Sequence, residues 1–235
     1  MLPIIILAGG LGTRISKYIG DIPKSLALVN NIPFIDHQLI ALKKQGFTDV
    51  VISIGYKGEF ISNYVGNGNK YGLNIIYSDD GENFLGTGGA IKKAAKYMND
   101  SFFILYGDSY LPINFLKVEK KFFEEKKLGL MTIFKNNNNF DKSNVHYNGD
   151  EIISYSKSKR TQNMMYIDYG LSILNKRIFL NYDFNKTFDL SECFVKLIHD
   201  KEITPYIVEE RFYEIGTING LIETESYIKN LGSMN

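Results

Sequence analysis

The sequence predicts an α/β fold, in which a doubly wound and mostly parallel sheet carries helices on both faces and a smaller β-rich part follows. Three observations predict this fold. Short apolar runs typical of buried strands alternate with helical patterns, the connections between successive runs are long enough to hold a helix, and a glycine-rich turn follows the first run. The alternation of predicted strands and helices ends after residue 135, where a polar, hairpin-like stretch begins.

The first half of the chain alternates strand and helix. Residues 4–7 (IIIL) form a continuous apolar run that predicts a buried parallel strand. Apolar side chains then recur at helical spacing over residues 33–45, and Gly46 follows as a stop signal. The same alternation continues in a βαβαβαβαβ order, with strands predicted at 49–55, 73–78, 101–109 and 128–134 and helices at 59–65, 86–98 and 115–127.

The second half reads as a smaller β-rich part followed by a helix. Asn148-Gly149 predicts a hairpin turn within a polar stretch, and the four consecutive asparagines at 136–139 predict a loop. Further strands are predicted at 164–174, 203–210 and 211–217, and helices at 191–200 and 221–230. Neither an internal repeat nor a Pro/Gly/Ser-rich linker interrupts the chain, which favours one domain over residues 1–235.

Composition and charge exclude several classes of protein. The 27 basic residues against 26 acidic ones give a net charge of +1, which argues against a general nucleic-acid binder. Apolar runs stay well short of the roughly 18 residues of a membrane span, and no basic segment precedes the first one, so we expect no membrane partner and no signal peptide. The single Cys193 cannot form an internal disulfide and fits a reducing, cytoplasmic setting.

The turn after the first strand, GGLGTR, is suited to bind an anion. Gly9, Gly10 and Gly12 allow backbone N–H groups to approach a phosphate that side chains would block. A dinucleotide fingerprint requires a third glycine where this chain has Ile15, and a Walker loop requires Gly-Lys-Ser/Thr, which is missing. A third interpretation is a triphosphate site completed by the cations that follow the turn.

Those cations are Arg14 and Lys24. Cleavage of a nucleoside triphosphate between its α- and β-phosphates builds charge on the α-phosphorus and on the leaving pyrophosphate. An arginine fork suits the leaving group and a lysine point charge suits the nonbridging oxygens, with Mg²⁺ normally required as well. Pro23 fixes the backbone just before Lys24.

These residues carry a clear resemblance. LAGGLGTR followed by Pro23-Lys24 resembles the signature of the sugar-phosphate nucleotidyltransferases, or NDP-sugar pyrophosphorylases, and the pattern is most similar to the short bacterial mannose- and heptose-1-phosphate guanylyltransferases. Four later segments continue the resemblance in order: FLGTGGAIKKA at 84–94, LYGDSYL at 105–111, DYGL at 168–171 and FYEIGTINGLIE at 212–223. The resemblance implies a Rossmann-like, GT-A-like nucleotidyltransferase fold, with residues 1–134 as the nucleotide-binding core and residues 135–235 as the sugar-phosphate-binding part.

The resemblance also implies roles for particular residues. Arg14 and Lys24 are the expected catalytic cations, and Asp108 and Glu214 the expected Mg²⁺ ligands. The nucleotide is expected at Leu7, Ala8, Gly9, Gly10, Gly12, Thr13, Gly86 and Thr87, and the sugar phosphate at Gly88, Lys157, Asp168, Tyr169 and Gly170. Two departures stand out, because the family usually has Asp at position 214 and Glu-Lys-Pro at 156–158, where this chain has Ser-Lys-Ser.

The expected reaction joins a nucleoside monophosphate from an NTP to a sugar 1-phosphate and releases pyrophosphate, with GTP favoured and a role in capsule or lipopolysaccharide synthesis. Alternatives are a uridylyl- or cytidylyltransferase, a non-catalytic nucleotide-sugar sensor and an NAD-dependent oxidoreductase. The sequence leaves the oligomeric state open, homo-oligomers included. Outside the motifs, Asp79 and Asp80 are interpreted as a solvated loop, the three histidines as dispersed structural or surface residues, and Cys193 as a buried spectator thiol.

Overall fold

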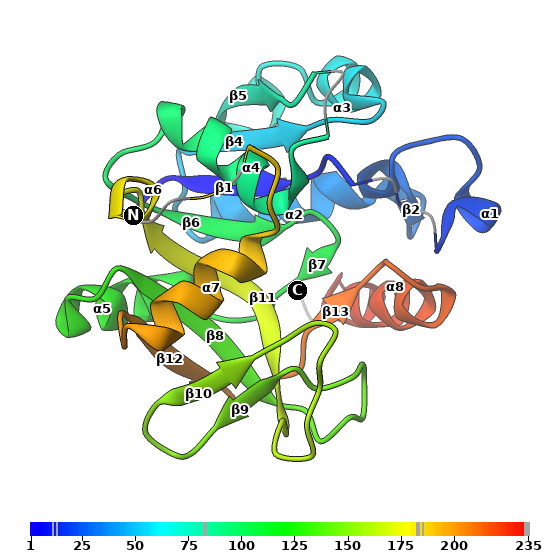
Figure 1. Ribbon diagram of the computed structural model, residues 1–235. Helices are drawn as coiled ribbons and strands as arrows, with labels where there is room; N and C mark the ends of the chain where they lie inside the picture. Colours follow the sequence, from blue (N-terminus) through cyan, green and yellow to red (C-terminus); the bar gives the residue numbers. More distant parts are fainter. Residues whose placement is uncertain (11, 13, 82–83, 182–183, 185, 233–235) are drawn as a thin grey trace.

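The fold is built on one twisted sheet, seen in the computed structural model of Figure 1, which describes residues 1–10, 12, 14–81, 84–181, 184 and 186–232. Within these residues nine strands join in one sheet. They are β1 (Ile4–Leu7), β4 (Asp49–Ile54), β5 (Asn74–Asp79), β6 (Ser101–Tyr106), β8 (Gly129–Lys135), β9 (Val145–Tyr147), β10 (Ile152–Tyr155), β11 (Tyr166–Asn175) and β12 (Ile203–Val208).

Four neighbouring strands of the sheet, in the order β6-β1-β4-β5, are parallel. Ile5 of β1 stands opposite Val51 of β4 on one side and Ile104 of β6 on the other. The predicted doubly wound α/β fold is therefore confirmed. The simple parallel succession is wrong at one point, because β11 inserts between β6 and β8 and runs antiparallel to both, while β12 continues the sheet parallel to β8.

Helices cover both faces of the sheet, in agreement with the alternation of buried side chains along its strands. Ile4 and Ile6 of β1 point to the face covered by α2 (Phe34–Lys44), α3 (Gly58–Val65) and α5 (Phe115–Glu125), where they join one core cluster. Ile5 points to the opposite face and joins a second cluster with α4 (Gly86–Ala94) and α7 (Leu190–His199), which lie in front of the sheet in Figure 1. Cys193 of α7 is fully buried there, and burial raises the pKa of its thiol to about 12.

A small third cluster fastens the C-terminal helix α8 (Ile218–Gly232) to the N-terminal part of the chain. Ala27, Val29 and Phe34 pack with Ile215 beside the short strands β2 (Leu28–Val29) and β3 (Ile32–Pro33).

The remaining short elements are α1 (Ser16–Ile19), α6 (Ile178–Asn181) and 3-10 turns at Lys24–Leu26, Asn69–Tyr71 and Ala95–Tyr97. None of the helices described here is long and apolar enough to cross a membrane.

The strand predicted at 101–109 is interrupted where the sequence reads Gly107-Asp108. The Gly107 amide donates a hydrogen bond of 3.0 Å to the Leu7 carbonyl, and a Cβ on Gly107 would lie only 2.5 Å from that oxygen. The chain therefore turns across the end of β1 and forms β7 (Ser109–Tyr110). The strand predicted at 211–217 shrinks to β13 (Tyr213–Glu214), which pairs antiparallel with β7 away from the main sheet.

Candidate active site

A cleft of about 660 Å³ opens at the carboxyl ends of the parallel strands. From β1 the chain proceeds to β4 and β5 on one side and then returns to β6 on the other, and ligands of open α/β sheets bind where the strand order reverses in this way. The cleft is lined by the glycine turn, by Ser53 near the end of β4, by the segments that follow β5 and β6, by the start of α4, and by β11.

The glycine turn forms the floor of the cleft, which Leu7, Ala8, Gly9, Gly10 and Gly12 all line. Gly12 adopts a left-handed φ of 60°, and its carbonyl accepts the amides that begin α1. A Cβ on Gly9 would lie 3.1 Å from the Gly55 nitrogen, so the turn is pressed against the end of β4. The predicted nucleotide contact at Thr13 lies outside the described residues.

Two cations and two carboxylates that are far apart in the sequence meet at one end of this turn. The Lys24 ammonium donates to Asp108 Oδ2 at 2.5 Å. The point where a Cβ on Gly216 would sit is 2.6 Å from Glu214 Oε2, 3.3 Å from Arg14 Nη2 and 3.5 Å from Asp108 Oδ2. All four predicted side chains thus face one small volume of the cleft.

Local structure explains how these groups come together. Pro23, with φ of −57°, precedes the 3-10 turn that presents Lys24. Asp108 follows the glycine that crosses the end of β1, and its carbonyl accepts the Ile215 amide at 3.0 Å. Glu214 is brought to the same place by the β7–β13 pair, in which it stands opposite Ser109.

The Glu214 carboxylate is fixed and partly desolvated. Its Oε1 accepts from the Thr217 hydroxyl at 2.8 Å and its Oε2 from the Gly216 amide. Burial raises the pKa of Glu214, the hydrogen bonds from Thr217 and Gly216 lower it, and the nearby charge of Asp108 raises it again. A divalent cation, added to Arg14 and Lys24 beside this pair of carboxylates, would further relieve the repulsion between Asp108 and Glu214.

This donor set fits Mg²⁺, which proteins usually hold through one or two carboxylates while water and substrate phosphates complete an octahedron. Across the described residues, no group of three or more His, Cys, Asp or Glu side chains is gathered for a metal. Asp108 and Glu214 are two carboxylates beside an open cleft, an arrangement that suits an ion whose other ligands come from water and a bound phosphate. A resident metal enclosed entirely by protein ligands does not match the described part of the chain.

The opposite wall of the cleft carries Asp168, which β11 holds in a polar cluster. Its Oδ2 accepts from the Tyr106 hydroxyl at 2.9 Å and from the Tyr155 hydroxyl at 3.4 Å. The Asp168 amide donates to Asn144 Oδ1 at 2.9 Å. Burial raises the pKa of Asp168, while the bonds from the Gly170 amide and from Tyr106 lower it. Asp168 can accept hydrogen bonds from the hydroxyls of a polar ligand.

The residues predicted next to Asp168 lie differently. Gly170 has φ of 100° at a register shift in the β11–β8 pairing, and its amide donates to Asp168 Oδ1 at 3.1 Å, so it shapes a bulge that supports Asp168. Tyr169 does not reach the cleft, because its ring is 1% exposed and packs against Phe134 and Phe212. Gly88 is also outside the lining, since it is packed against the Phe188 ring, which a Cβ there would approach to 2.3 Å.

Lys157, Gly86 and Thr87 line the cleft where α4 meets α7. The Lys157 ammonium donates to Asp189 Oδ1 at 2.8 Å, and Thr87 Oγ1 donates to Asp189 Oδ2 at 3.0 Å. Burial opposes ionisation of Asp189, but the bonds from Lys157 and Ser191 lower its pKa to about 2. Asp189 also caps α7, so this ion pair links the helix to the cleft wall.

Comparison with known proteins identifies the family. Residues 4–230 match the nucleotidyl transferase family. This chain belongs to the nucleotidyl transferase family. The prediction of a sugar-1-phosphate nucleotidyltransferase is thereby confirmed.

Among individual relatives, D-glycero-alpha-D-manno-heptose 1-phosphate guanylyltransferase of Campylobacter jejuni is 32% identical over 90% of this chain and 93% of that protein. The enzyme of the same name from Aneurinibacillus thermoaerophilus is 34% identical over 90% of this chain and 92% of its own length. The crystal structure of HddC from Yersinia pseudotuberculosis superposes with a TM-score of 0.82 at 25% identity, covering 97% of this chain and 100% of HddC, and that protein is also known in complex with GMP-PN.

Several cleft residues of this transferase could not be predicted from a sequence motif. Ser53, Asn144, Tyr155 and Arg160 line the cleft, although none of them belongs to a recognisable motif. The position of Ser53 could have indicated a role in the site, because it is a polar residue near the carboxyl end of a buried strand that pairs with β1. Asn144 directly precedes β9 and Tyr155 is the last residue of β10, and the position of this hairpin relative to β11 depends on long-range pairing.

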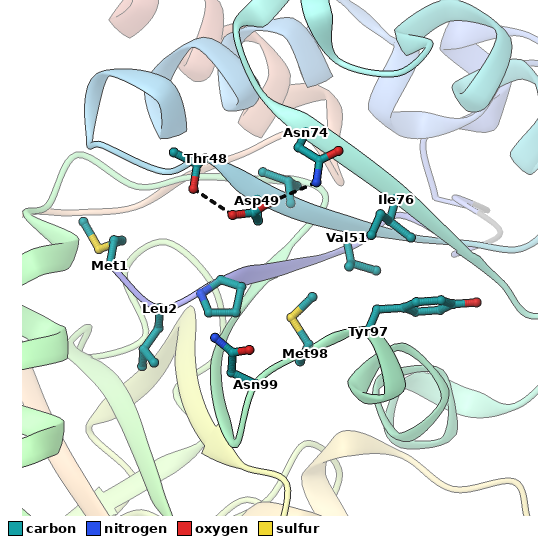
Figure 2. Close-up of a pocket in the computed structure, with 12 residues that line it drawn as sticks. Met1, Leu2, Thr48, Asp49, Val51, Asn74, Ile76, Tyr97, Met98 and Asn99 are labelled. Carbon is teal, nitrogen blue, oxygen red and sulfur yellow. Dashed lines mark hydrogen bonds between the residues drawn. The ribbon is translucent and has the colours of Figure 1, made fainter.

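A second pocket of about 260 Å³ lies near the amino ends of β1, β4 and β5, at the other end of the strands from the cleft (Figure 2). Asp49 is the acidic residue of this pocket. Its Oδ2 accepts from the Thr48 hydroxyl at 2.8 Å and its Oδ1 from the Asn74 side-chain amide at 3.0 Å. Both hydrogen bonds are drawn as dashed lines in Figure 2. These bonds lower the pKa of Asp49. None of the predicted site residues lies there.

The space for Glu214 in place of the usual aspartate depends on glycines. A Cβ on Gly220 would lie 2.1 Å from Glu214 Oε1 and 2.5 Å from its carbonyl oxygen. Gly220→Ala is therefore expected to displace the carboxylate and to raise the Mg²⁺ concentration needed for half-maximal turnover by about tenfold, the size of effect seen when ligand-supporting residues are changed. Pyrophosphate release during a Mg²⁺ titration measures this, with the exposed Asn219→Ala as the control. An unchanged Mg²⁺ dependence would contradict it.

Asp168→Asn is expected to weaken binding of the sugar phosphate more than it slows turnover. Loss of an acceptor for charge-assisted hydrogen bonds corresponds to roughly 10- to 100-fold in KM for the acceptor. The KM for the nucleotide should stay unchanged, because Asp168 lies on the opposite wall from the glycine turn. Steady-state kinetics with each substrate varied in turn test this, and equal effects on both KM values would argue against it.

Proposed function

We propose that this protein transfers a guanylyl group from GTP to a heptose or hexose 1-phosphate, forming a GDP-sugar and pyrophosphate. The observation that carries the proposal is the meeting of Arg14, Lys24, Asp108 and Glu214 around one volume beside the glycine turn. The choice of GTP and of a heptose or hexose acceptor is supported by the guanylyltransferases that share about a third of its residues over nearly their full lengths.

In the proposed reaction, a phosphate oxygen of the sugar 1-phosphate attacks the α-phosphorus of GTP. The new O–P bond forms as the bond from the α-phosphorus to the bridging α–β oxygen breaks, and the electron pair leaves with pyrophosphate. The attacking oxygen is already deprotonated near neutral pH, so the reaction needs no general base. Catalysis then comes from positioning and from stabilisation of charge.

Each charged group has a part in this scheme. The amides of Gly9–Gly12 and the Arg14 fork hold the β- and γ-phosphates, and Lys24 stabilises the charge that develops on the α-phosphate. Asp108 and Glu214 would hold Mg²⁺, which when bound supplies further neutralisation of the phosphate oxygens. Lys157 receives the acceptor phosphate, exchanging its bond to Asp189, and Asp168 accepts from sugar hydroxyls.

The decisive experiment is a matrix of four NTPs against several sugar 1-phosphates, followed by pyrophosphate release. Turnover with GTP and a heptose or hexose 1-phosphate, dependent on Mg²⁺, is the expected result. Preference for UTP or CTP would show that the protein is a uridylyl- or cytidylyltransferase. Absence of Mg²⁺-dependent turnover with any pair would overturn the enzymatic proposal and favour a nucleotide-sugar sensor.

Two further proposals concern the cellular setting of the reaction. A cytoplasmic location rests on the free, buried Cys193, which suits a reducing compartment. In capsule or lipopolysaccharide synthesis, a glycosyltransferase would use the GDP-sugar as its donor substrate. A deletion strain in which surface polysaccharide loses a heptose or hexose would support that role.

A further inference from the structure

The cleft extends past the glycine turn toward β4 and the edge strand β5, where three buried side-chain oxygens lack a hydrogen-bond partner within the described part of the chain. These atoms are Ser53 Oγ, Ser78 Oγ and Asp80 Oδ1. Ser53 and Ser78 stand opposite each other in the β4–β5 pairing, and Asp80 follows two residues after Ser78. Ser53 and Asp80 line the cleft, so these unpaired groups face a space that a ligand can enter.

The interpretation of residues 79 and 80 as a solvated loop is wrong for Asp80, whose carboxylate is partly buried. Asp79 is exposed, but Asp80 is half-buried and its backbone amide is fixed by a 2.9 Å bond to the Ile54 carbonyl. Burial raises the pKa of Asp80 to about 6, an effect that Lys93 reduces and Asp79 increases. The carboxylate is thus ionised at neutral pH, and a buried, unpaired acceptor destabilises the fold unless a ligand supplies the donor.

The strand order indicates which part of the substrate reaches Asp80. Along the carboxyl edge the sheet runs β5, β4, β1, β6, β11, so the phosphate-binding groups at β1 and β6 lie between Asp80 and Asp168. Asp168 lies on the side proposed for the sugar, which leaves the nucleoside for the β4–β5 side. Phe84, with 68% of its surface exposed, lines the same part of the cleft and offers a ring face to a base.

We infer that Asp80 selects the base of the nucleotide, its carboxylate accepting the two adjacent N–H donors of guanine, the ring N1–H and the exocyclic amine. This inference rests on the proposed function and deepens it. Uracil and thymine present one N–H between two carbonyl oxygens, which a carboxylate repels. Cytosine and adenine present an amine beside a ring nitrogen with a lone pair, so one carboxylate oxygen would face an acceptor.

The test compares wild type with Asp80→Asn, and uses Asp79→Asn as the matched control because it removes a neighbouring carboxylate that does not line the cleft. In wild type and the control, kcat/KM for GTP should exceed that for UTP. In Asp80→Asn the ratio should fall by about 10²-fold or more, as for sites that lose a specificity-determining hydrogen-bond partner. The KM for the sugar phosphate should not change.

Two further readouts separate this inference from the proposed function and from misfolding. Calorimetric binding of GTP and UTP reports base preference even if no acceptor is turned over. Asp80→Asn should also raise the melting temperature, because it removes a desolvated charge. A wild type that binds GTP and UTP equally, or an Asp80→Asn variant that keeps the wild-type preference, would overturn the inference.

Discussion

Replacement of Asp108 by asparagine should lower the rate of pyrophosphate release by about 10³-fold, the upper range for loss of one preorganised electrostatic group. Asp108 is paired with Lys24 at 2.5 Å and shares its volume with Glu214 and Arg14. An amide oxygen can still accept a hydrogen bond from Lys24, but the ion pair is lost, and so is one of the two anionic oxygen donors proposed for Mg²⁺. Steady-state kcat at saturating substrates and at several Mg²⁺ concentrations measures the effect.

The control for this change is Asp150→Asn, which alters an exposed aspartate in the hairpin turn between β9 and β10. It should leave kcat unchanged. Thermal melting of both variants separates loss of chemistry from loss of fold, and only a small change in melting temperature is expected for a partly exposed ion pair such as Lys24–Asp108. An Asp108→Asn variant with the wild-type rate would refute the proposed metal site.

Lys24→Met should have two opposite effects, a lower turnover rate and tighter binding of Mg²⁺. The rate should fall by roughly 10²- to 10³-fold, because the α-phosphate loses its cation during bond cleavage. Without the ammonium, only Arg14 is left to balance the carboxylates of Asp108 and Glu214, so a divalent cation gains a stronger site. Pyrophosphate release gives the first effect, and a calorimetric Mg²⁺ titration of the nucleotide-free protein gives the second.

The comparison variant is Lys117→Met, which removes an exposed ammonium from the first turn of α5. Neither the rate nor the Mg²⁺ affinity should respond to it. If Lys24→Met lowered both the rate and the Mg²⁺ affinity, Lys24 would be supporting the structure of the metal site, contrary to the proposed charge balance.

The nucleotide half of the cleft could be predicted from sequence because its determinants are local. A buried strand followed by glycines places the turn at a carboxyl edge, and Asp108 follows another buried strand at the same edge. The structure brings the predicted cations and carboxylates of this half into one volume, while their roles in catalysis stay predictions.

The acceptor half was harder to predict because its shape depends on pairings between distant segments. The antiparallel insertion of β11 has no local signature, and it decides which residues of 135–200 face the cleft. Asp168 and Tyr169 were both expected to contact the sugar, yet neighbouring residues of a strand point to opposite faces, so only one of them could do so. Asp80 was missed because its partial burial arises from tertiary packing that a Ser-Asp-Asp-Gly stretch does not reveal.

The pairing of β13 with β7 has a consequence for the order of biosynthesis. Glu214 stands opposite Ser109, more than a hundred residues earlier in the chain, so its carboxylate joins Asp108 only after synthesis has passed residue 214. A nascent chain with the glycine turn and both cations already made still lacks the second acidic group. We therefore expect fragments truncated before residue 210 to bind nucleotide weakly and to show no pyrophosphate release, so activity first arises after the β13 segment has been synthesised and has paired with β7.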